Sequence, residues 1–257
     1  MGEQGRGWKM TAGALAAAWR FLPLAWRRAG LVLAAGAVSA AFAGTPGLAG
    51  WCDCGLLLVL ALVGAGATWR LALGAGPVGP GGFQMGAMEA RLAAAGVLRW
   101  IFLVIVFLLA FTALLAVAYA GASAGHGFVA SDVRTWSGAA DARGRALMGA
   151  AAVACAGFWL WAQARTALAS AASTARGKVQ VLASWPLTRR HAVTVLSVQA
   201  GCAAAPALVL AAAMLLPGRF FMLIAGAAIL GLWLPLTAGA GAYLYRSLEP
   251  QDPSRPG

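Results

Sequence analysis

Residues 100–122 decide the fold; they read WIFLVIVFLLAFTALLAVAYAGA and contain no Asp, Glu, Lys, Arg or His. About 20 apolar helical residues cross the roughly 30 Å hydrocarbon core of a bilayer. Outward from this stretch lie five more charge-free runs: Ala29–Gly50, Cys54–Trp69, Ala146–Ala164, Ala192–Gly218 and Phe220–Tyr245. The strands of a membrane barrel alternate apolar and polar residues, whereas these runs are continuously apolar. In lipid a helix satisfies the hydrogen bonds of its own backbone. We therefore predict an all-α polytopic membrane protein with six transmembrane helices plus short interfacial amphipathic helices.

Composition supports this class. Of the 257 residues, 61% are hydrophobic and 10% are charged, and the mean hydropathy is +0.80. Soluble domains are about 45–50% apolar and about 25% charged. These values exclude a disordered chain, a disulfide scaffold and a standard soluble enzyme.

The distribution of cations predicts the orientation. With a cytoplasmic N-terminus, 15 of the 19 basic residues fall on the cytoplasmic side, and the other side receives Arg134, Arg143, Arg145 and Arg219. This asymmetry follows the positive-inside rule. We expect a bacterial inner-membrane protein with both termini cytoplasmic: an interfacial segment 1–28, a six-helix domain 29–246 and a disordered tail 247–257. Cleavage of a signal peptide after Ala43 is the alternative, but the 28 residues before the first run are patterned.

Two cytoplasmic segments combine cations with Trp. In residues 8–28, Trp8, Trp19 and Trp26 fall on one helical stripe at 100° per residue, with Lys9, Arg20 and Arg27 beside or opposite it. This pattern suits a helix in the interface plane, which Pro23 breaks or kinks; a cytoplasmic extension of the first span is the alternative. Residues 178–186 predict a short helix at the interface or against the bundle. The candidate lipid- or partner-binding residues are Trp19, Arg20, Trp26, Arg27, Arg28, Arg176, Lys178, Trp185, Arg189 and Arg190.

Short stretches of the chain resemble a bacterial family. They are Ala18-Trp19-Arg20-Phe21-Leu22-Pro23, Phe83-Gln84-Met85-Gly86, Arg165-Thr166-Ala167-Leu168-Ala169-Ser170, Ala175-Arg176-Gly177-Lys178-Val179 and Ser184-Trp185-Pro186-Leu187-Thr188-Arg189. In these residues the chain resembles the YciC-like inner-membrane proteins and the membrane domain fused to some glycerophosphodiester phosphodiesterases. The resemblance implies a six-span inner-membrane protein without an established activity. The soluble segments are too short for a phosphodiesterase domain, so that activity is not carried over.

Residues that could support catalysis or bind a metal are scattered. His126 and His191 have no second histidine nearby, and Asp132 and Asp141 fit a solvated turn. We interpret the cysteines of Cys52-Asp53-Cys54 as small residues at the membrane boundary. The alternatives are a pair of free thiols, contacts with a partner protein, or two ligands of a metal shared across subunits. No phosphate-binding loop, nucleophile elbow or paired-histidine motif is present in the sequence. We expect no enzymatic activity, no metal and no cofactor.

Two functions follow from this pattern. The first is a non-enzymatic envelope or membrane-organising protein whose basic cytoplasmic face contacts anionic lipids or another membrane protein; nucleic acid is not expected, because the cations adjoin membrane ends. The alternative is a transporter or exporter of a neutral or lipid-like solute. Its predicted polar centre is Gln199 with Ser197, because every Asp, Glu, Lys and Arg falls outside the six runs. We also expect close helix contacts at small residues such as Gly201, Ala205, Ala227 and Gly231.

Overall fold

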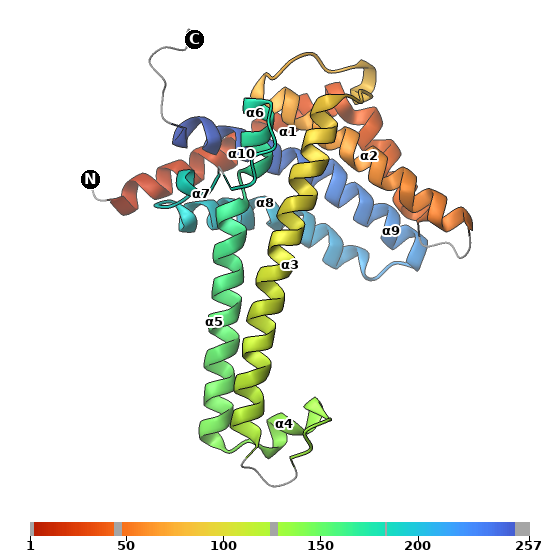
Figure 1. Ribbon diagram of the computed structural model, residues 1–257. Helices are drawn as coiled ribbons and strands as arrows, with labels where there is room; N and C mark the ends of the chain where they lie inside the picture. Colours follow the sequence, from red (N-terminus) through yellow and green to blue (C-terminus); the bar gives the residue numbers. More distant parts are fainter. Residues whose placement is uncertain (1–2, 44–47, 124–127, 183, 250–257) are drawn as a thin grey trace. The chain divides into compact units, whose positions relative to one another are not determined.

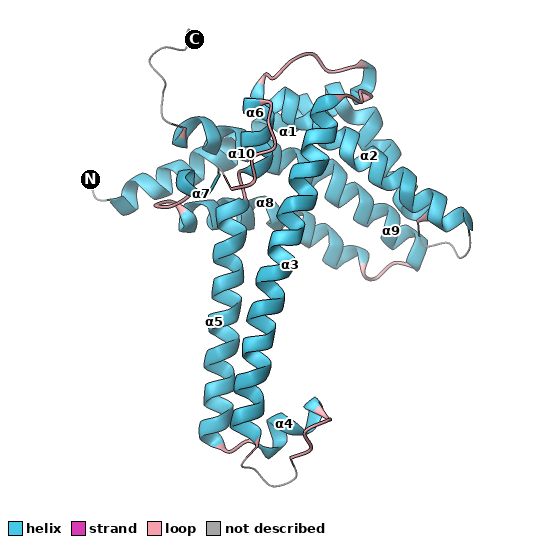
Figure 2. Cartoon of the chain, viewed as in Figure 1, coloured by secondary structure: helices cyan, strands magenta, loops and turns pink. Residues whose placement is uncertain are grey.

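The computed structural model describes residues 3–43, 48–123, 128–182 and 184–249, and throughout these ranges the secondary structure is helical without strands (Figures 1 and 2). Six helical segments are long and apolar enough to cross a membrane: Gly7–Phe42, Gly50–Leu73, Pro80–Ala122, Ala142–Arg176, Ala192–Ala213 and Gly218–Leu248. The predicted all-α polytopic fold is confirmed. The shortest charge-free run, residues 54–69, lies within a helix of 26 residues, which is long enough to cross a bilayer.

The elements follow one another in the order α1 Glu3–Phe42, α2 Leu48–Leu73, η1 Pro80–Gly82, α3 Ala87–Ala122, α4 Val133–Ala139, α5 Ala142–Thr166, α6 Ala169–Arg176, α7 Ser184–Leu187, α8 Ala192–Ala213, α9 Gly218–Gly226, η2 Ala227–Trp233 and α10 Leu234–Leu248. They form two compact units. The larger unit comprises Met1–Val97 with Arg165–Gly257, and the hairpin unit comprises Leu98–Ala164.

Helix α1 is the central element of the larger unit, and α2, α8, α9, η2, α10 and η1 all pack against it. It is one helix of 40 residues with Pro23 inside it. The predicted interfacial helix and the first span are therefore joined without interruption, as in the alternative of an extended first span. Proline removes one backbone hydrogen bond, but the helix continues past it because neighbouring helices pack along its whole length.

The buried face of α1 is lined with small side chains. Ala14, Ala18, Ala25 and Ala29 are fully buried, and their spacing of four, seven and four residues places them on one side of a helix. The exposed side carries the large aromatic residues, with Trp8 73% exposed. Small residues at a helix interface let backbones approach closely, which is how helices associate in lipid.

Glycines provide the matching surface on the partner helices. A Cβ added at Gly201 of α8 would lie 2.7 Å from Leu15, and one at Gly231 of η2 would lie 2.7 Å from Trp26. Similarly, Gly226 of α9 adjoins Ala37. The predicted close contacts at Gly201 and Gly231 are confirmed, and α1 is the partner in both.

The stretch η2, Ala227–Trp233, is a π-helix between α9 and α10. A π-helix replaces i→i+4 bonds by i→i+5 bonds and is rare. The indole Nε1 of Trp26 donates a hydrogen bond of 2.9 Å to the carbonyl oxygen of Gly231. The wider turn is thus fixed to α1 by a side chain distant in sequence.

The hairpin unit consists of the later part of α3 and the earlier part of α5, which run side by side with α4 at their connecting end (Figure 1). Tyr119, Phe128 and Trp136 pack edge to face or tilted at that end. Asp132 caps α4 by accepting a 3.0 Å hydrogen bond from the backbone N–H of Arg134. Most apolar side chains of the hairpin point away from it, such as Leu109 at 65% exposed, which is the surface that lipid covers.

Candidate functional site

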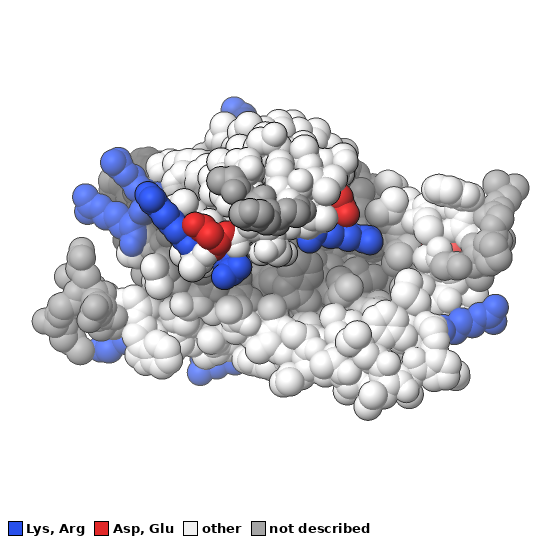
Figure 3. Space-filling view, turned by 90° about the horizontal axis from the view of Figure 1, so that it is seen from below, with Lys and Arg blue, Asp and Glu red and all other residues white. Residues whose placement is uncertain are grey.

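Ten cations of the larger unit are exposed and form no ion pair within the described part of the chain: Lys9, Arg20, Arg27, Arg28, Arg91, Lys178, Arg189, Arg190, Arg219 and Arg246. All except Lys9, Arg91, Arg219 and Arg246 belong to the predicted lipid- or partner-binding set. Basic groups outnumber acidic groups on the molecular face shown in Figure 3, and large uncharged areas separate them. These side chains are therefore available to an anionic ligand.

Three other members of the predicted set, Arg176, Trp185 and Trp26, make contacts within the larger unit. The Arg176 guanidinium donates from Nε to the Tyr245 hydroxyl at 3.2 Å and lies 3.4 Å from the Glu249 carboxylate. The guanidinium of Arg165 lies 5.7 Å from the centre of the Trp185 ring. Trp26 is hydrogen-bonded to η2, as described above. Trp19, by contrast, is 50% exposed on α1.

The predicted polar centre on α8 is not brought together. Ser197 is exposed and Gln199 is half-buried, because residues two apart point about 200° away from each other around a helix. The buried face of α8 carries Thr194, Val198 and Cys202 instead.

The cysteines are free thiols. Cys52 is exposed, and Cys54 donates a 3.1 Å hydrogen bond to the Ala43 carbonyl, which ties the start of α2 to the end of α1. Among the described residues no group of three or more His, Cys, Asp or Glu side chains could hold a metal ion. His126 lies outside the described residues, and His191 is at the N-cap position of α8.

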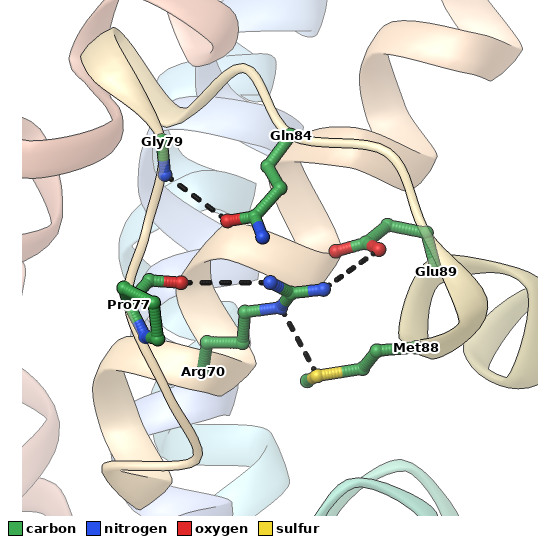
Figure 4. Close-up of polar contacts among 6 residues, drawn as sticks. All are labelled: Arg70, Pro77, Gly79, Gln84, Met88 and Glu89. Carbon is green, nitrogen blue, oxygen red and sulfur yellow. Dashed lines mark hydrogen bonds and ion pairs between the residues drawn. The ribbon is translucent and has the colours of Figure 1, made fainter.

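The most distinctive polar feature is a buried ion pair, drawn in Figure 4. Arg70 lies in the last turn of α2 and Glu89 in the first turn of α3. Their side chains are 9% and 1% exposed, and Nη2 of Arg70 lies 2.8 Å from Oε2 of Glu89. Solvent screens such a buried pair little, so each charge is stabilised mainly by its partner.

Arg70 also fixes the connector between α2 and α3. Its Nε donates to the Met88 sulfur at 3.1 Å and its Nη1 to the Pro77 carbonyl at 3.5 Å. Within the connector, the backbone N–H of Gly79 donates to the Gln84 side chain at 3.1 Å (Figure 4). The guanidinium therefore bridges both ends of this segment.

The connector packs on α1 through two glycines. Gly81 and Gly82 have φ of +62° and +90°, values that favour glycine. A Cβ at Gly82 would lie 2.8 Å from the backbone of Ala29. The Gly- and Pro-rich composition of the connector thus serves a close approach to α1.

Glu89 has one oxygen left over. Its Oε1 has no hydrogen-bond partner among the residues that the structure describes. This oxygen lies 2.5 Å from the point that a Cβ at Gly66 of α2 would occupy. Glycine at position 66 therefore makes room for the carboxylate. An unsatisfied buried oxygen is costly, which makes the pair a candidate for function as well as stability.

The six charge-free runs leave both Arg70 and Glu89 outside the predicted spans, and nothing in their spacing predicted that the two side chains pair. The available signal was an acid and a base flanking the same Gly/Pro-rich segment at the facing ends of two helices. A second missed contact lies in the hairpin unit, where Arg99 donates a 2.9 Å hydrogen bond from Nη2 to the Gln163 side chain.

No protein-family model, curated protein or solved structure matches the chain. Its fold and composition alone place it in a class: six long apolar helices make it a multi-pass integral membrane protein.

Proposed function

We propose that the protein is a non-enzymatic component of the bacterial inner membrane, with both termini cytoplasmic, whose basic residues contact anionic lipid headgroups. The observation that carries this proposal is the exposed surface of α1, where Trp8 and Trp19 alternate with Lys9, Arg20 and Arg28 and no carboxylate neutralises these cations within the described residues.

The length of α1 supports the proposal. At 1.5 Å per residue its 40 residues extend about 60 Å, roughly twice the hydrocarbon thickness of a bilayer. About half of the helix therefore lies outside the hydrocarbon if the other half spans it. The half with Trp and cations is suited to the headgroup region, because indole rings and basic side chains both prefer it.

The size of the effect can be worked out from the charges. A basic side chain near an anionic surface contributes about 1 kcal/mol. The four cations of α1, Lys9, Arg20, Arg27 and Arg28, then contribute about 4 kcal/mol, which corresponds to a roughly thousandfold preference for anionic over zwitterionic headgroups.

The test compares two triple variants extracted with their native lipids into polymer-bounded discs. Arg20→Gln/Arg27→Gln/Arg28→Gln should lower the ratio of phosphatidylglycerol to phosphatidylethanolamine bound to the protein. Arg134→Gln/Arg143→Gln/Arg145→Gln removes the same charge from the hairpin unit and should leave that ratio unchanged. An unchanged ratio in the α1 variant contradicts the proposal. If the α1 variant lost a crosslink to another protein while its bound-lipid ratio stayed unchanged, the basic face would be assigned to a protein partner instead.

A further inference from the structure

We propose that Arg91, Lys178 and the turn at Gly177 form a binding site for a phosphate group. The inference rests on the proposed function and deepens it, because it assigns the headgroup chemistry to a defined place. Gly177 ends α6 in the left-handed conformation, with φ +61°. Nη1 of Arg91, from the start of α3, lies 3.6 Å from the point that a Cβ at Gly177 would occupy.

Packing holds these two distant segments together. Ala95, Ala169 and Val181 form a small buried cluster. Ala95 is one helical turn after Arg91, so it lies on the same face of α3, and Val181 follows Gly177 in the segment after α6. The convergence of Arg91 on Gly177 is therefore a built feature of the larger unit.

The balance of charge leaves this place positive. Arg91 and Lys178 are exposed and have no acceptor or carboxylate partner among the described residues. Arg176 already binds Glu249 and Tyr245. The C-terminus of α6 contributes about half a negative charge, which leaves about one and a half positive charges for a ligand.

The shape of the site suits an anion of the phosphate class. Apart from the adjoining residues, Nη1 of Arg91 is the only described heavy atom within 4 Å of the vacant Cβ position at Gly177. The space beside Gly177 is therefore bordered by Nη1 of Arg91 and by the adjoining residues alone among the described atoms. Arginine binds phosphate with paired N–H donors and lysine binds it as a point charge. A phosphate carries one to two negative charges at neutral pH, which matches the remaining positive charge.

The surroundings favour a phosphate that is carried by a lipid. Val179 and Leu182, which follow Lys178, are 39% and 61% exposed. Exposed apolar side chains that follow Lys178 in the chain provide a surface for acyl chains next to the headgroup. Inorganic phosphate has the same anionic chemistry without the acyl chains, so the experiment must separate these two sources.

The test measures binding of phosphatidylglycerol to the full chain in detergent by native mass spectrometry. Arg91→Gln/Lys178→Gln should weaken binding of the tightest lipid about tenfold or more, because each charge-assisted hydrogen bond contributes more than a neutral one. The single variant Arg91→Lys keeps the positive charge and should bind the lipid more tightly than Arg91→Gln/Lys178→Gln but less tightly than the wild type. The matched control Arg134→Gln/Arg143→Gln should bind as the wild type does. A melting temperature within about 2 °C of wild type shows that each variant is folded.

The outcomes separate the possibilities. Displacement of the lipid by millimolar inorganic phosphate would assign the site to free phosphate, and retention would assign it to the lipid headgroup; both support a phosphate site. Unchanged lipid affinity in the double variant overturns the site. If the α1 triple variant still loses its phosphatidylglycerol in that case, the proposed function stands without this site. If neither variant changes lipid binding, both proposals fail.

Discussion

The buried ion pair gives the sharpest prediction about stability. Replacing one partner, as in Arg70→Met or Glu89→Met, leaves the other charge buried and unpaired. Because the side chains are 9% and 1% exposed and 2.8 Å apart, each single variant should lower the free energy of unfolding by about 3–5 kcal/mol. The double variant should lose much less than the sum, since two apolar side chains of similar volume leave no unpaired charge.

The second ion pair of the larger unit is the control. Arg176 and Glu249 are 3.4 Å apart, and their side chains are 32% and 23% exposed. A partly exposed pair of this kind contributes about 0–1 kcal/mol, so Glu249→Gln should change stability little. The contrast between the two pairs tests burial rather than charge.

The measurement is unfolding of the full chain by sodium dodecyl sulfate in mixed micelles, followed by tryptophan fluorescence and analysed as a double-mutant cycle. A coupling energy above about 1.5 kcal/mol between Arg70 and Glu89 is expected. Single variants that each cost less than about 1 kcal/mol, with additive effects, would refute the burial argument.

Three further predictions concern Gly66, Trp26 and the orientation in the membrane. Gly66→Ala should lower the free energy of unfolding by about 1–3 kcal/mol, because the added methyl group clashes with the buried carboxylate. Gly55→Ala, on the same helix with open space around it, should raise it by about 0.5–1 kcal/mol. Thermal melting distinguishes these opposite changes in stability. Trp26→Phe should cost about 1 kcal/mol, measured in the same micelles, because the carbonyl of Gly231 loses its donor. Reporter fusions after Asp141 and at the C-terminus should report opposite compartments, and a shared compartment contradicts the predicted orientation.

The six helices could be predicted because lipid imposes a simple rule. Any stretch that crosses must be long, apolar and helical, and runs such as Trp100–Ala122 meet that rule without reference to the rest of the chain. Ion pairs are different. Arg70 directly follows the run Cys54–Trp69 and Glu89 precedes the run Trp100–Ala122. Their pairing depends on the path of the connector between them, which composition does not determine.

The face of α1 shows a second limit. The Trp stripe suggested an interfacial helix, and its members Trp8 and Trp19 are exposed as that interpretation requires. The same helix has an equally periodic stripe of alanines, including Ala18 and Ala25, which is the packing face. Trp26 of the same Trp stripe packs against Gly231 of η2, whereas Trp8 and Trp19 are exposed. Periodicity of large residues alone therefore does not identify the buried side.

The π-helical stretch constrains the chain in a way that residue identity does not express. In a helix of 3.6 residues per turn, positions five apart differ by about 140° in direction, whereas the wider turn of i→i+5 bonding brings them closer in direction. Gly226 and Gly231, five residues apart across this stretch, both adjoin α1. Deleting a single residue between them would rotate everything from Leu234 onwards by about 100° relative to α9. The count of residues in this stretch is therefore under the same constraint as the two glycines that it aligns.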